Sequence, residues 1–347
     1  MNDAGWQAAR QLICELPQDP QPTQAEGVTV SAWSLAREDS DCTGDVLIEG
    51  FGCMLPDVTL AQLTARTHKP VWINLEYFSA EDWVPSFHLQ SGFDWERGAT
   101  RWFFFPGVHE HSGGMLRERG LIEARDAVVR QGGGEAFVNA TGLGLRRSRM
   151  LRPYNNNNDN NMVCFAYAHA PYDILFEALT TVHSGQVSIA LCGQQTQAAV
   201  AQLNTDAYPS LKTQNVPFVS QPAFDALLWQ ADVLWVRGED SLARALWSGR
   251  PFIWHIYPQA ENAHHAKLMA WLAHYTQPFP AALREALVDV HCAWNGVTET
   301  ATLREAWGRL MAQWDDWRDY SLLRSNQLAQ MPDLARRLMA FSRTVDQ

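Results

Sequence analysis

The sequence predicts an α/β protein with two domains. Short, strongly apolar runs alternate with segments of helical period, which is the pattern of strands joined by crossover helices. The apolar runs do not alternate polar and apolar residues, so we expect parallel strands that are covered on both faces. A chain of 347 residues exceeds one ordinary hydrophobic core, and two domains are therefore expected.

The expected elements follow from these patterns in chain order. We expect strands over residues 28–33, 45–51, 71–75, 102–105, 162–167, 186–192, 233–236 and 252–256, with helices over 60–67, 172–180, 195–203, 224–231 and 242–248 between several of them. Beyond residue 299 the chain is expected to be helical, and a last helix covers 331–343. Trp307, Trp314 and Trp317 recur at helical spacing, which predicts a stripe of core residues.

Composition excludes several classes of protein. The formal net charge of -11 and the lack of a basic stripe argue against nucleic acid or an anionic membrane as partner, because phosphate contacts need clustered lysine and arginine. The six cysteines include no CxxC pair, so neither a zinc knuckle nor a dithiol motif is expected. No apolar run approaches the roughly 18 residues of a membrane span. We expect a soluble, cytoplasmic protein.

One junction between a strand and a helix carries the clearest chemical signal. A short apolar strand over residues 233–236 is expected to break at Gly238, where the chain restarts as a helix, and Arg237 lies between them. The first turn of the next helix then holds Glu239, Asp240 and Ser241. Free N–H groups and the helix dipole attract anions there, and glycine lets a bound group approach the backbone. The junction therefore suits a phosphate, with Arg237 available to offset the two acids.

Simpler explanations exist for this junction and for the histidines that follow. The helix start is also explained by a side-chain cap, with Asp240 or Ser241 as N-cap and Glu239 in solvent. His255 lies on an apolar strand, where a satisfied core histidine is more common than a catalyst. The histidines at 264–265 form a metal pair only with further ligands, which the sequence does not place.

Other low-complexity runs point to loops. The run YNNNNDNN at 154–161 cannot bury apolar surface, so we expect an exposed linker or loop tip that divides the chain. The acidic run at 37–45 is expected to be a solvated loop. Glycine-rich turns at 112–114 and 132–134 match neither a Walker nor a dinucleotide fingerprint, so ATP and NAD are not expected.

Several long stretches together resemble the bacterial family of protein-arginine rhamnosyltransferases, the EarP-like enzymes. They are IEGFGCMLP (48–56), KPVWINLEYFSAEDW (69–83), HSGGMLRERGL (111–121), VPFVSQPAFDALLWQAD (216–232), VRGEDSLARA (236–245) and RPFIWHIYPQAENAH (250–264). The match runs in order from about residue 45 to the C-terminus. The resemblance implies an inverting enzyme that moves rhamnose from dTDP-β-L-rhamnose to an arginine of translation elongation factor P, with no metal or other cofactor.

The resemblance also implies a fold and a division of the chain. The implied architecture is GT-B, in which two Rossmann-like domains face each other across a cleft. We assign residues 1–153 to an N-terminal, acceptor-side domain that is shortened, and 154–161 to a linker. Residues 162–330 then form the donor-binding domain, and 331–347 a C-terminal helix.

By position, the resemblance assigns a set of residues to the donor. They are Phe165, Tyr167, Phe218, Gln221, Phe224, Arg237, Asp240 and Ser241, together with Glu239, which is similar to a residue required for catalysis. Phe165 and Tyr167 fall near the nucleotide, and the stretch 218–224 matches the base-binding segment. A thymine ring prefers an aromatic face and an amide that hydrogen-bonds its edge. Without the resemblance, the phenylalanines are more simply core residues.

The start of the chain departs from the family pattern. Family members open with a strand and a motif that carries two aspartates. Here only the second aspartate has a counterpart, Asp3, while Asn2 replaces a glycine and the segment 12–28 is shorter. We hypothesise that Asp3, together with Glu239, binds the acceptor guanidinium and takes its proton as the C–N bond forms.

Two other functions remain open from the sequence. A catalytically impaired family member would bind dTDP-sugar through the C-terminal half without transferring it. A nucleotide-sugar transferase for a small acceptor would turn over without the protein substrate. Mass spectrometry of the elongation factor separates these possibilities, because only the first enzyme adds a deoxyhexose to it.

Overall fold

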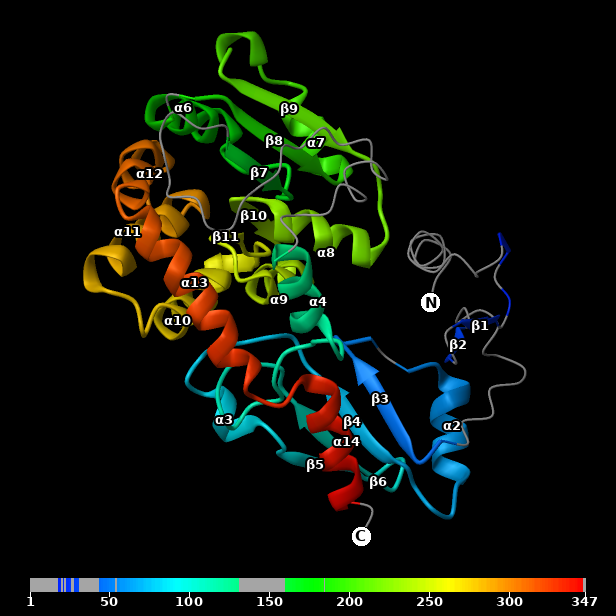
Figure 1. Cartoon of the computed structure of the whole chain (residues 1–347). Helices are drawn as coiled ribbons and strands as arrows, with labels where there is room; N and C mark the ends of the chain where they lie inside the picture. Colours follow the sequence, from blue (N-terminus) through cyan, green and yellow to red (C-terminus); the bar gives the residue numbers. More distant parts are fainter. Residues whose placement is uncertain are drawn as a thin grey trace. The chain divides into compact units, whose positions relative to one another are not determined.

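The computed structural model describes residues 18, 19, 21, 23–25, 28–30, 44–53, 55–130, 160–183 and 185–345. The chain divides into two compact units, which are Met1–Met115 with Pro332–Gln347, and Leu116–Met331. Each unit is built around a sheet of mainly parallel strands. Figure 1 labels these strands and colours them in chain order. The expected α/β class is therefore confirmed.

The first unit contains a four-stranded sheet with the order β3-β4-β6-β5. Its strands are β3 (Val46–Gly50), β4 (Val71–Leu75), β5 (Ser91–Asp94) and β6 (Ala99–Phe104). The first two and β6 are parallel, whereas β5 pairs with β6 in the antiparallel direction. The helix α2 (Asp57–Ala65) connects β3 to β4, and the short helix α3 (Val84–Phe87) precedes β5.

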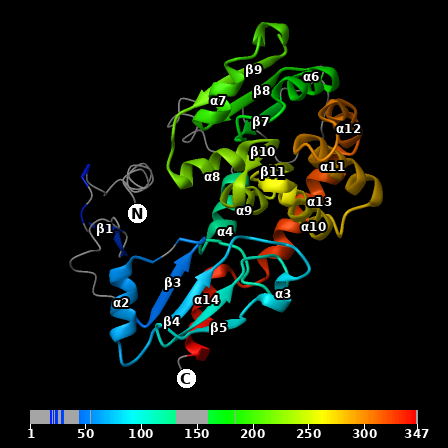
Figure 2. The same cartoon turned by 180° about the vertical axis from the view of Figure 1, so that it is seen from behind.

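Helices cover both faces of this sheet. On one face Trp72 is fully buried beside Leu63 of α2. On the other face Ile73 and Phe104 contact α14 (Leu334–Val345), whose Phe341 ring lies 6.1 Å from that of Phe104. Neighbouring residues of β4 point to opposite faces, as the pleat requires. The last helix is thus part of this unit's core (Figure 2).

The second unit contains a five-stranded sheet in which all strands are parallel. Its strands are β7 (Asn160–Cys164), β8 (Val187–Cys192), β9 (Leu211–Val216), β10 (Val233–Arg237) and β11 (Phe252–His255). Their spatial order is β11-β10-β7-β8-β9. Because the chain runs outward from β7 to one edge and then from β10 to the other, the sheet is doubly wound like a Rossmann fold.

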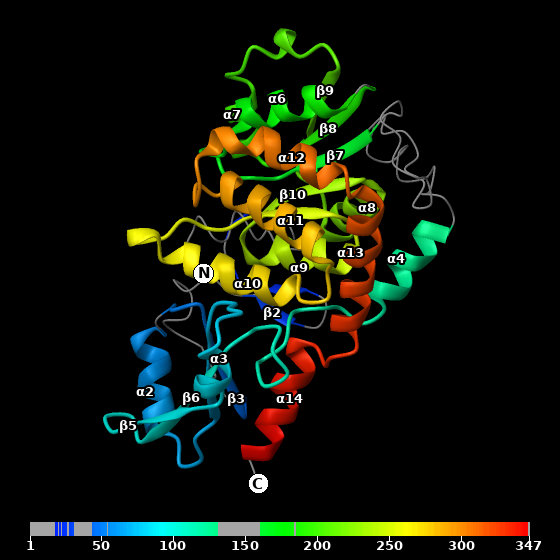
Figure 3. The ribbon, with the colours of Figure 1, turned by 90° about the vertical axis from the view of Figure 1, so that its left-hand side faces the viewer.

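The second unit is rich in helices. They are α4 (Leu121–Arg130), α6 (Tyr172–Val182), α7 (Gln194–Val200), α8 (Gln221–Gln230), α9 (Gly238–Ser248), α10 (Ala263–Tyr275), α11 (Ala281–Trp294), α12 (Leu303–Met311) and α13 (Trp314–Ala329), with short 3-10 turns at Thr205–Ala207, Ala260–Asn262 and Thr300–Thr302. Helices α6, α11 and α12 pack together over one face of the sheet, and α8 and α9 lie on the other (Figure 3).

Tryptophans fill much of the core of this unit. Trp235 on β10 is almost fully buried, and its ring lies 4.6 Å from that of Trp294 and 5.4 Å from that of Trp307. Trp314 and Trp317 are also buried. The expected burial of Trp307, Trp314 and Trp317 is confirmed, although they lie on two successive helices, α12 and α13, and not on one helical stripe.

The two units do not divide the chain where the sequence suggested. Helix α4 was expected on the N-terminal side, yet it belongs to the second unit. Its Arg125 is buried and donates hydrogen bonds to the Trp247 carbonyl and the Ser325 hydroxyl, both at 3.0 Å. A buried arginine needs such acceptors, and these are far from it in sequence. The C-terminal helix joins the first unit for the same kind of reason, its contacts with β4 and β6.

The last two residues of the asparagine run belong to a strand and not to the predicted linker. Asn160 and Asn161 are buried in β7, so the linker expected at 154–161 is wrong at its end. The Asn160 side chain lies 3.2 Å from the His183 ring nitrogen, and the Asn161 N–H donates to Asp232 at 2.8 Å. The polar side chain of Asn160 therefore has a buried partner, which makes it acceptable in a strand. The rest of the run and residues 37–43 lie outside the described residues.

Four strands differ from the sequence expectations, and the first of them, β1 (Thr23–Ala25), was not expected. The strand expected over 28–33 is β2 (Val28–Val30), which is exposed and pairs with β1 in the antiparallel direction. Two intervening residues are too few for the crossover that parallel strands need. Strands β5 and β9 were not predicted, because both lie at sheet edges and carry mostly exposed side chains.

We predict that two matched substitutions separate the core of the second unit from its surface. Leu310→Ala on α12 removes a fully buried side chain and should lower the free energy of unfolding by about 2–5 kcal/mol. Leu323→Ala on α13, where the side chain is 44% exposed, should lower it by less than about 1 kcal/mol. Urea unfolding followed by circular dichroism measures both changes, and equal losses would contradict the assignment of α12 to the core.

Candidate active site

The strand order of the second unit creates a natural ligand site. Neighbouring strands β7 and β10 are followed by helices on opposite faces of the sheet, α6 after β7 and α9 after β10. The segments that leave the two strands therefore diverge, and ligands of doubly wound sheets bind at such a point, beyond the carboxyl ends of the strands. Phe165 and Tyr167 follow β7, and Arg237 ends β10. The fold thus brings together residues that are about seventy positions apart in sequence.

Arg237 is held over two aromatic rings. Its guanidinium carbon lies 4.5 Å from the ring centre of Phe165 and 4.8 Å from that of Tyr167. Its Nη1 donates a hydrogen bond of 2.6 Å to Oε1 of Gln195. Cation–π contacts and the hydrogen bond fix a positive charge at the switch point, which is the place beyond the carboxyl ends of β7 and β10 where the chain diverges to opposite faces of the sheet. Gly193 directly precedes α7, the helix that carries Gln195. Its φ is +76°, and a Cβ added there would lie 2.6 Å from the Phe165 ring, so this position requires glycine.

Helix α9 begins without a side-chain cap. It starts at Gly238, whose φ is +65°, and the N-cap residue Arg237 makes no capping hydrogen bond through its side chain. The alternative in which Asp240 or Ser241 is the N-cap is therefore wrong. The first N–H groups of a helix have no partner within the helix, and with no side-chain cap they can bind an anion. The junction retains the chemistry expected for a phosphate site.

Both acids of the first turn lie near a basic side chain, and Asp240 shares its partner Arg244 with Asp225 and Glu118. The Glu239 carboxylate lies 3.5 Å from Nζ of Lys267 on α10, and Asp240 lies 3.8 Å from Nε of Arg244 on α9. The ion pair with Lys267 offsets the charge of Glu239, which would otherwise repel an anion at the helix start. Ser241 is buried. The sequence did not single out Lys267 or Arg244, although Lys267 is one of only three lysines in the chain.

The fold brings together only some of the residues expected to bind the thymine base. Phe224 on α8 contacts Phe165 edge to face, with ring centres 5.8 Å apart. Gln221 begins α8, and its amide donates to Asp225 over 3.4 Å. Phe218 is 61% exposed in the segment between β9 and α8. The predicted catalytic residue Asp3 lies outside the described residues.

His255 is buried beneath Tyr167 and hydrogen-bonds its backbone. It is 3% exposed, and its Nδ1 accepts a hydrogen bond of 3.3 Å from the N–H of Tyr167. Burial, with the nearby His169, Arg237 and His264, lowers the pKa of His255 from 6.5 to about 3. A neutral, hydrogen-bonded core histidine is the alternative that the sequence favoured. Tyr257, which the sequence did not single out, is exposed and contacts Tyr167 edge to face at 5.7 Å.

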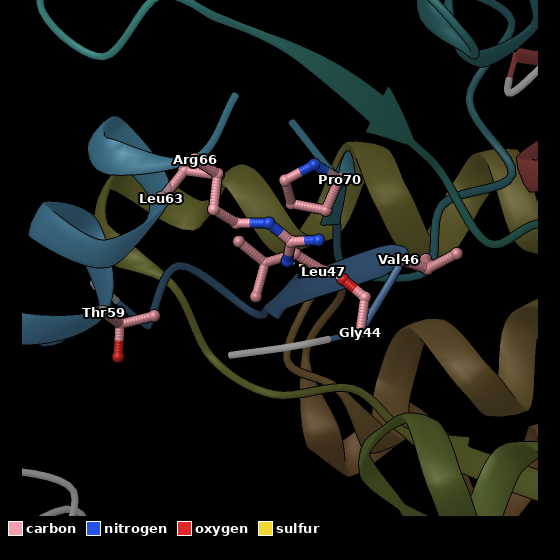
Figure 4. A pocket seen from close by; sticks show the side chains of 7 residues that line it. All are labelled: Gly44, Val46, Leu47, Thr59, Leu63, Arg66 and Pro70. Atoms are coloured by element: carbon pink, nitrogen blue, oxygen red, sulfur yellow. Dashed lines mark hydrogen bonds between the residues drawn. The ribbon is translucent and has the colours of Figure 1, made fainter. Parts of the chain in front are cut away.

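A pocket in the first unit fits a ligand site less well. Figure 4 shows its lining residues, Gly44, Val46, Leu47, Thr59, Leu63, Arg66 and Pro70. Its volume is about 100 Å³, whereas ligand pockets usually hold roughly 300–1,000 Å³. It lies where β3 and β4 begin, opposite to the strand ends that bind ligands in such sheets. Arg66 Nη1 donates there to the Gly44 carbonyl at 2.9 Å.

The part of the chain that the structure describes contains neither a cluster of metal ligands nor a helix that could span a membrane. No group of three or more histidine, cysteine, aspartate or glutamate side chains is placed to hold a metal ion. The rings at 264–265 adjoin each other at 4.4 Å, without further ligands among the described residues. No helix there is both long enough and apolar enough to cross a bilayer.

The two parallel-stranded units and the site at the switch point define an α/β glycosyltransferase of the GT-B class. A sequence model of the family described as "Elongation-Factor P (EF-P) rhamnosyltransferase EarP" matches residues 4–343. The chain belongs to this family. The resemblance found in the sequence is thereby confirmed.

Individual relatives agree with this assignment. A protein-arginine rhamnosyltransferase of Pseudomonas aeruginosa is 36% identical over 321 residues, which are 91% of this chain and 82% of that protein. The one from Pseudomonas putida is 34% identical over 97% of this chain and 94% of its own length. A solved structure described as the basis for EarP-mediated arginine glycosylation of EF-P has 31% identity and a TM-score of 0.58, covering 70% of this chain and 76% of that one.

We predict that His255 makes stability depend on pH. Between about pH 6.5 and 3 the unfolded chain binds a proton that the folded protein excludes. The free energy of unfolding therefore falls as the pH drops below 6.5. In His255→Asn this part of the loss is absent, so the difference in unfolding free energy between pH 7.5 and 5.5 should shrink by about 1.4 kcal/mol. Urea titrations at both pH values measure it, and an unchanged difference would contradict a neutral His255.

Proposed function

We propose that the protein transfers rhamnose from dTDP-β-L-rhamnose to an arginine side chain of EF-P, with inversion at the anomeric carbon. The observation that carries this proposal is the uncapped start of α9 beside the fixed cation Arg237. Together they suit the charged diphosphate of a nucleotide sugar. The named relatives support arginine as acceptor and rhamnose as the sugar.

The proposed donor lies along the carboxyl ends of the strands. Its diphosphate accepts hydrogen bonds from the first-turn N–H groups at Glu239–Ser241, and the Arg237 guanidinium adds positive charge. Its thymine lies toward α8, where Phe224 offers an aromatic surface and Gln221 an amide. Phe165, Tyr167 and Phe218 complete the set of aromatic residues around the nucleotide.

The proposed reaction is a single displacement. A guanidinium nitrogen of EF-P attacks the anomeric carbon from the face opposite to the diphosphate. A C–N bond forms while the C–O bond breaks, and the diphosphate leaves with the bonding electrons. The charge that develops on the leaving group is stabilised by the helix N–H groups and Arg237, which act where other enzymes use a metal. No metal or other cofactor is therefore part of this proposal.

The acceptor must lose a proton during transfer. An arginine side chain has a pKa above about 12, so it is not deprotonated beforehand at neutral pH. In the proposal Asp3, with Glu239, binds the guanidinium and accepts the proton as the new bond forms. The ion pair with Lys267 holds the Glu239 carboxylate at the start of α9.

The proposed partners follow from the reaction. EF-P is the protein substrate, and dTDP-rhamnose is the donor. EF-P acts in translation, so the proposed place of action is the cytoplasm. The formal charge of -11 does not favour nucleic acid or an anionic membrane as a further partner.

We predict that the protein adds one deoxyhexose to EF-P. Purified protein, dTDP-β-L-rhamnose and EF-P are incubated together, and the intact mass of EF-P is measured. The mass should rise by one deoxyhexose residue on a single arginine, which fragmentation locates. Binding of dTDP with no change in EF-P would indicate a catalytically impaired member instead. Release of dTDP only with a small acceptor would favour a transferase of another specificity.

A matched pair of substitutions tests the proposed base. Asp3→Asn should lower kcat by at least about 100-fold and leave the Kd of dTDP nearly unchanged. Asp19→Asn changes another acid of the same segment and should leave both values unchanged. An Asp3→Asn protein that is as active as the original would exclude Asp3 as the base.

A further inference from the structure

A buried arginine joins the two helices on which the proposed donor site is built. Arg244 of α9 is 6% exposed. Its Nη1 donates to Asp225 Oδ2 at 3.2 Å and to Glu118 Oε2 at 2.8 Å, and its Nη2 makes a second, shorter bond to Glu118. Its Nε lies 3.8 Å from Asp240 Oδ1. One guanidinium therefore contacts three carboxylates on three segments of the second unit.

Two of these carboxylates belong to different parts of the donor site. Asp225 lies on α8, directly after Phe224, and accepts a hydrogen bond from Gln221. Phe224 and Gln221 form the proposed surface for the thymine base. Asp240 lies in the first turn of α9, where the diphosphate is proposed to bind. The guanidinium is a rigid, planar fork, so the contacts made by Arg244 restrict how far α8 and α9 can separate.

The third carboxylate fixes the arginine itself. Glu118 meets it through two hydrogen bonds, the arrangement that holds a guanidinium in one orientation. The segment that carries Glu118 is tied to the same helix, because Trp247 Nε1 donates to the Leu116 carbonyl at 2.8 Å. Glu118 thus holds Arg244 in one orientation while Arg244 contacts Asp225 and Asp240.

A nucleoside diphosphate needs both parts at one separation. Its base and its diphosphate are covalently joined, so binding one half brings the other to its subsite at a high effective concentration. This gain is lost when the subsites no longer match the length of the molecule. A residue that sets their separation therefore affects the whole ligand more than either half.

We propose that Arg244 is a positioning residue that sets the separation between the base-binding end of α8 and the diphosphate-binding start of α9. It does not touch the donor. The identity of the nucleotide as dTDP rests on the proposed function. Arg244 thus sets the KM for the donor, while the chemical step at saturating donor is left to other residues.

The test compares a whole ligand with its halves. Arg244→Lys keeps a positive charge for Asp225 but loses the fork, so it cannot hold Asp225, Asp240 and Glu118 together. Kd values are measured for dTDP by calorimetry, and for thymidine and pyrophosphate by NMR titration. The Kd of dTDP should rise about tenfold or more, while that of each half changes less than about threefold. In the transfer assay the KM for the donor should rise while kcat stays within about threefold.

A second buried arginine provides the control. Arg125→Lys alters a side chain that is 1% exposed and binds the Trp247 carbonyl, Ser325 and Asn326. None of these partners belongs to the proposed donor site. This variant should lose thermal stability but keep the original ratio between the affinity for dTDP and the affinities for its halves.

Other outcomes overturn the proposal. Arg244→Lys that binds dTDP like the original protein would exclude the positioning role. Equal weakening of dTDP and of both halves would show general damage instead. Should Arg244→Lys fail to fold by circular dichroism, Glu118→Gln replaces it, since it leaves Asp225 paired, and the same ratio decides. A protein that binds dTDP but leaves EF-P unmodified would sink the proposed function and leave this inference standing.

Discussion

The order of five parallel strands is the constraint on which the site depends. Because β7 and β10 are neighbours and the chain continues to opposite faces after them, the segments beyond their carboxyl ends diverge. Phe165 and Tyr167 leave one strand at this place, and α9 leaves the other. Any mutation that altered this order would separate the aromatic residues from the helix start, whatever side chains they carried.

Electrostatics at the start of α9 then decide what can bind. A helix terminus with two acids in its first turn would repel a diphosphate if the acids were unpaired. Lys267 offsets Glu239, and Arg244 offsets Asp240 only in part, because Glu118 and Asp225 share it. Arg237 adds a cation held by two rings and by Gln195. The helix N–H groups are left without a side-chain cap. The balance of charge at this helix start therefore suits an anionic ligand.

Local patterns predicted the elements, and long-range contacts determined what the sequence could not show. The strand, turn and helix around Gly238 were predictable, because glycine and a polar first turn interrupt an apolar run. Strand β9 was not, because its edge position leaves a polar, exposed sequence. The grouping of α4 and α14 depends on contacts of Arg125 and Phe341 with residues distant in sequence. Lys267 was missed for the same reason, since only the fold brings α10 to Glu239.

A crystal structure of the protein with dTDP would show whether the donor binds at the start of α9. The β-phosphate should lie within hydrogen-bond distance of the N–H groups there, with the thymine ring against Phe224. The guanidinium of Arg237 should remain within reach of the diphosphate. A nucleotide bound elsewhere, or a diphosphate that makes no contact with the first turn of α9, would contradict a donor site at this helix start.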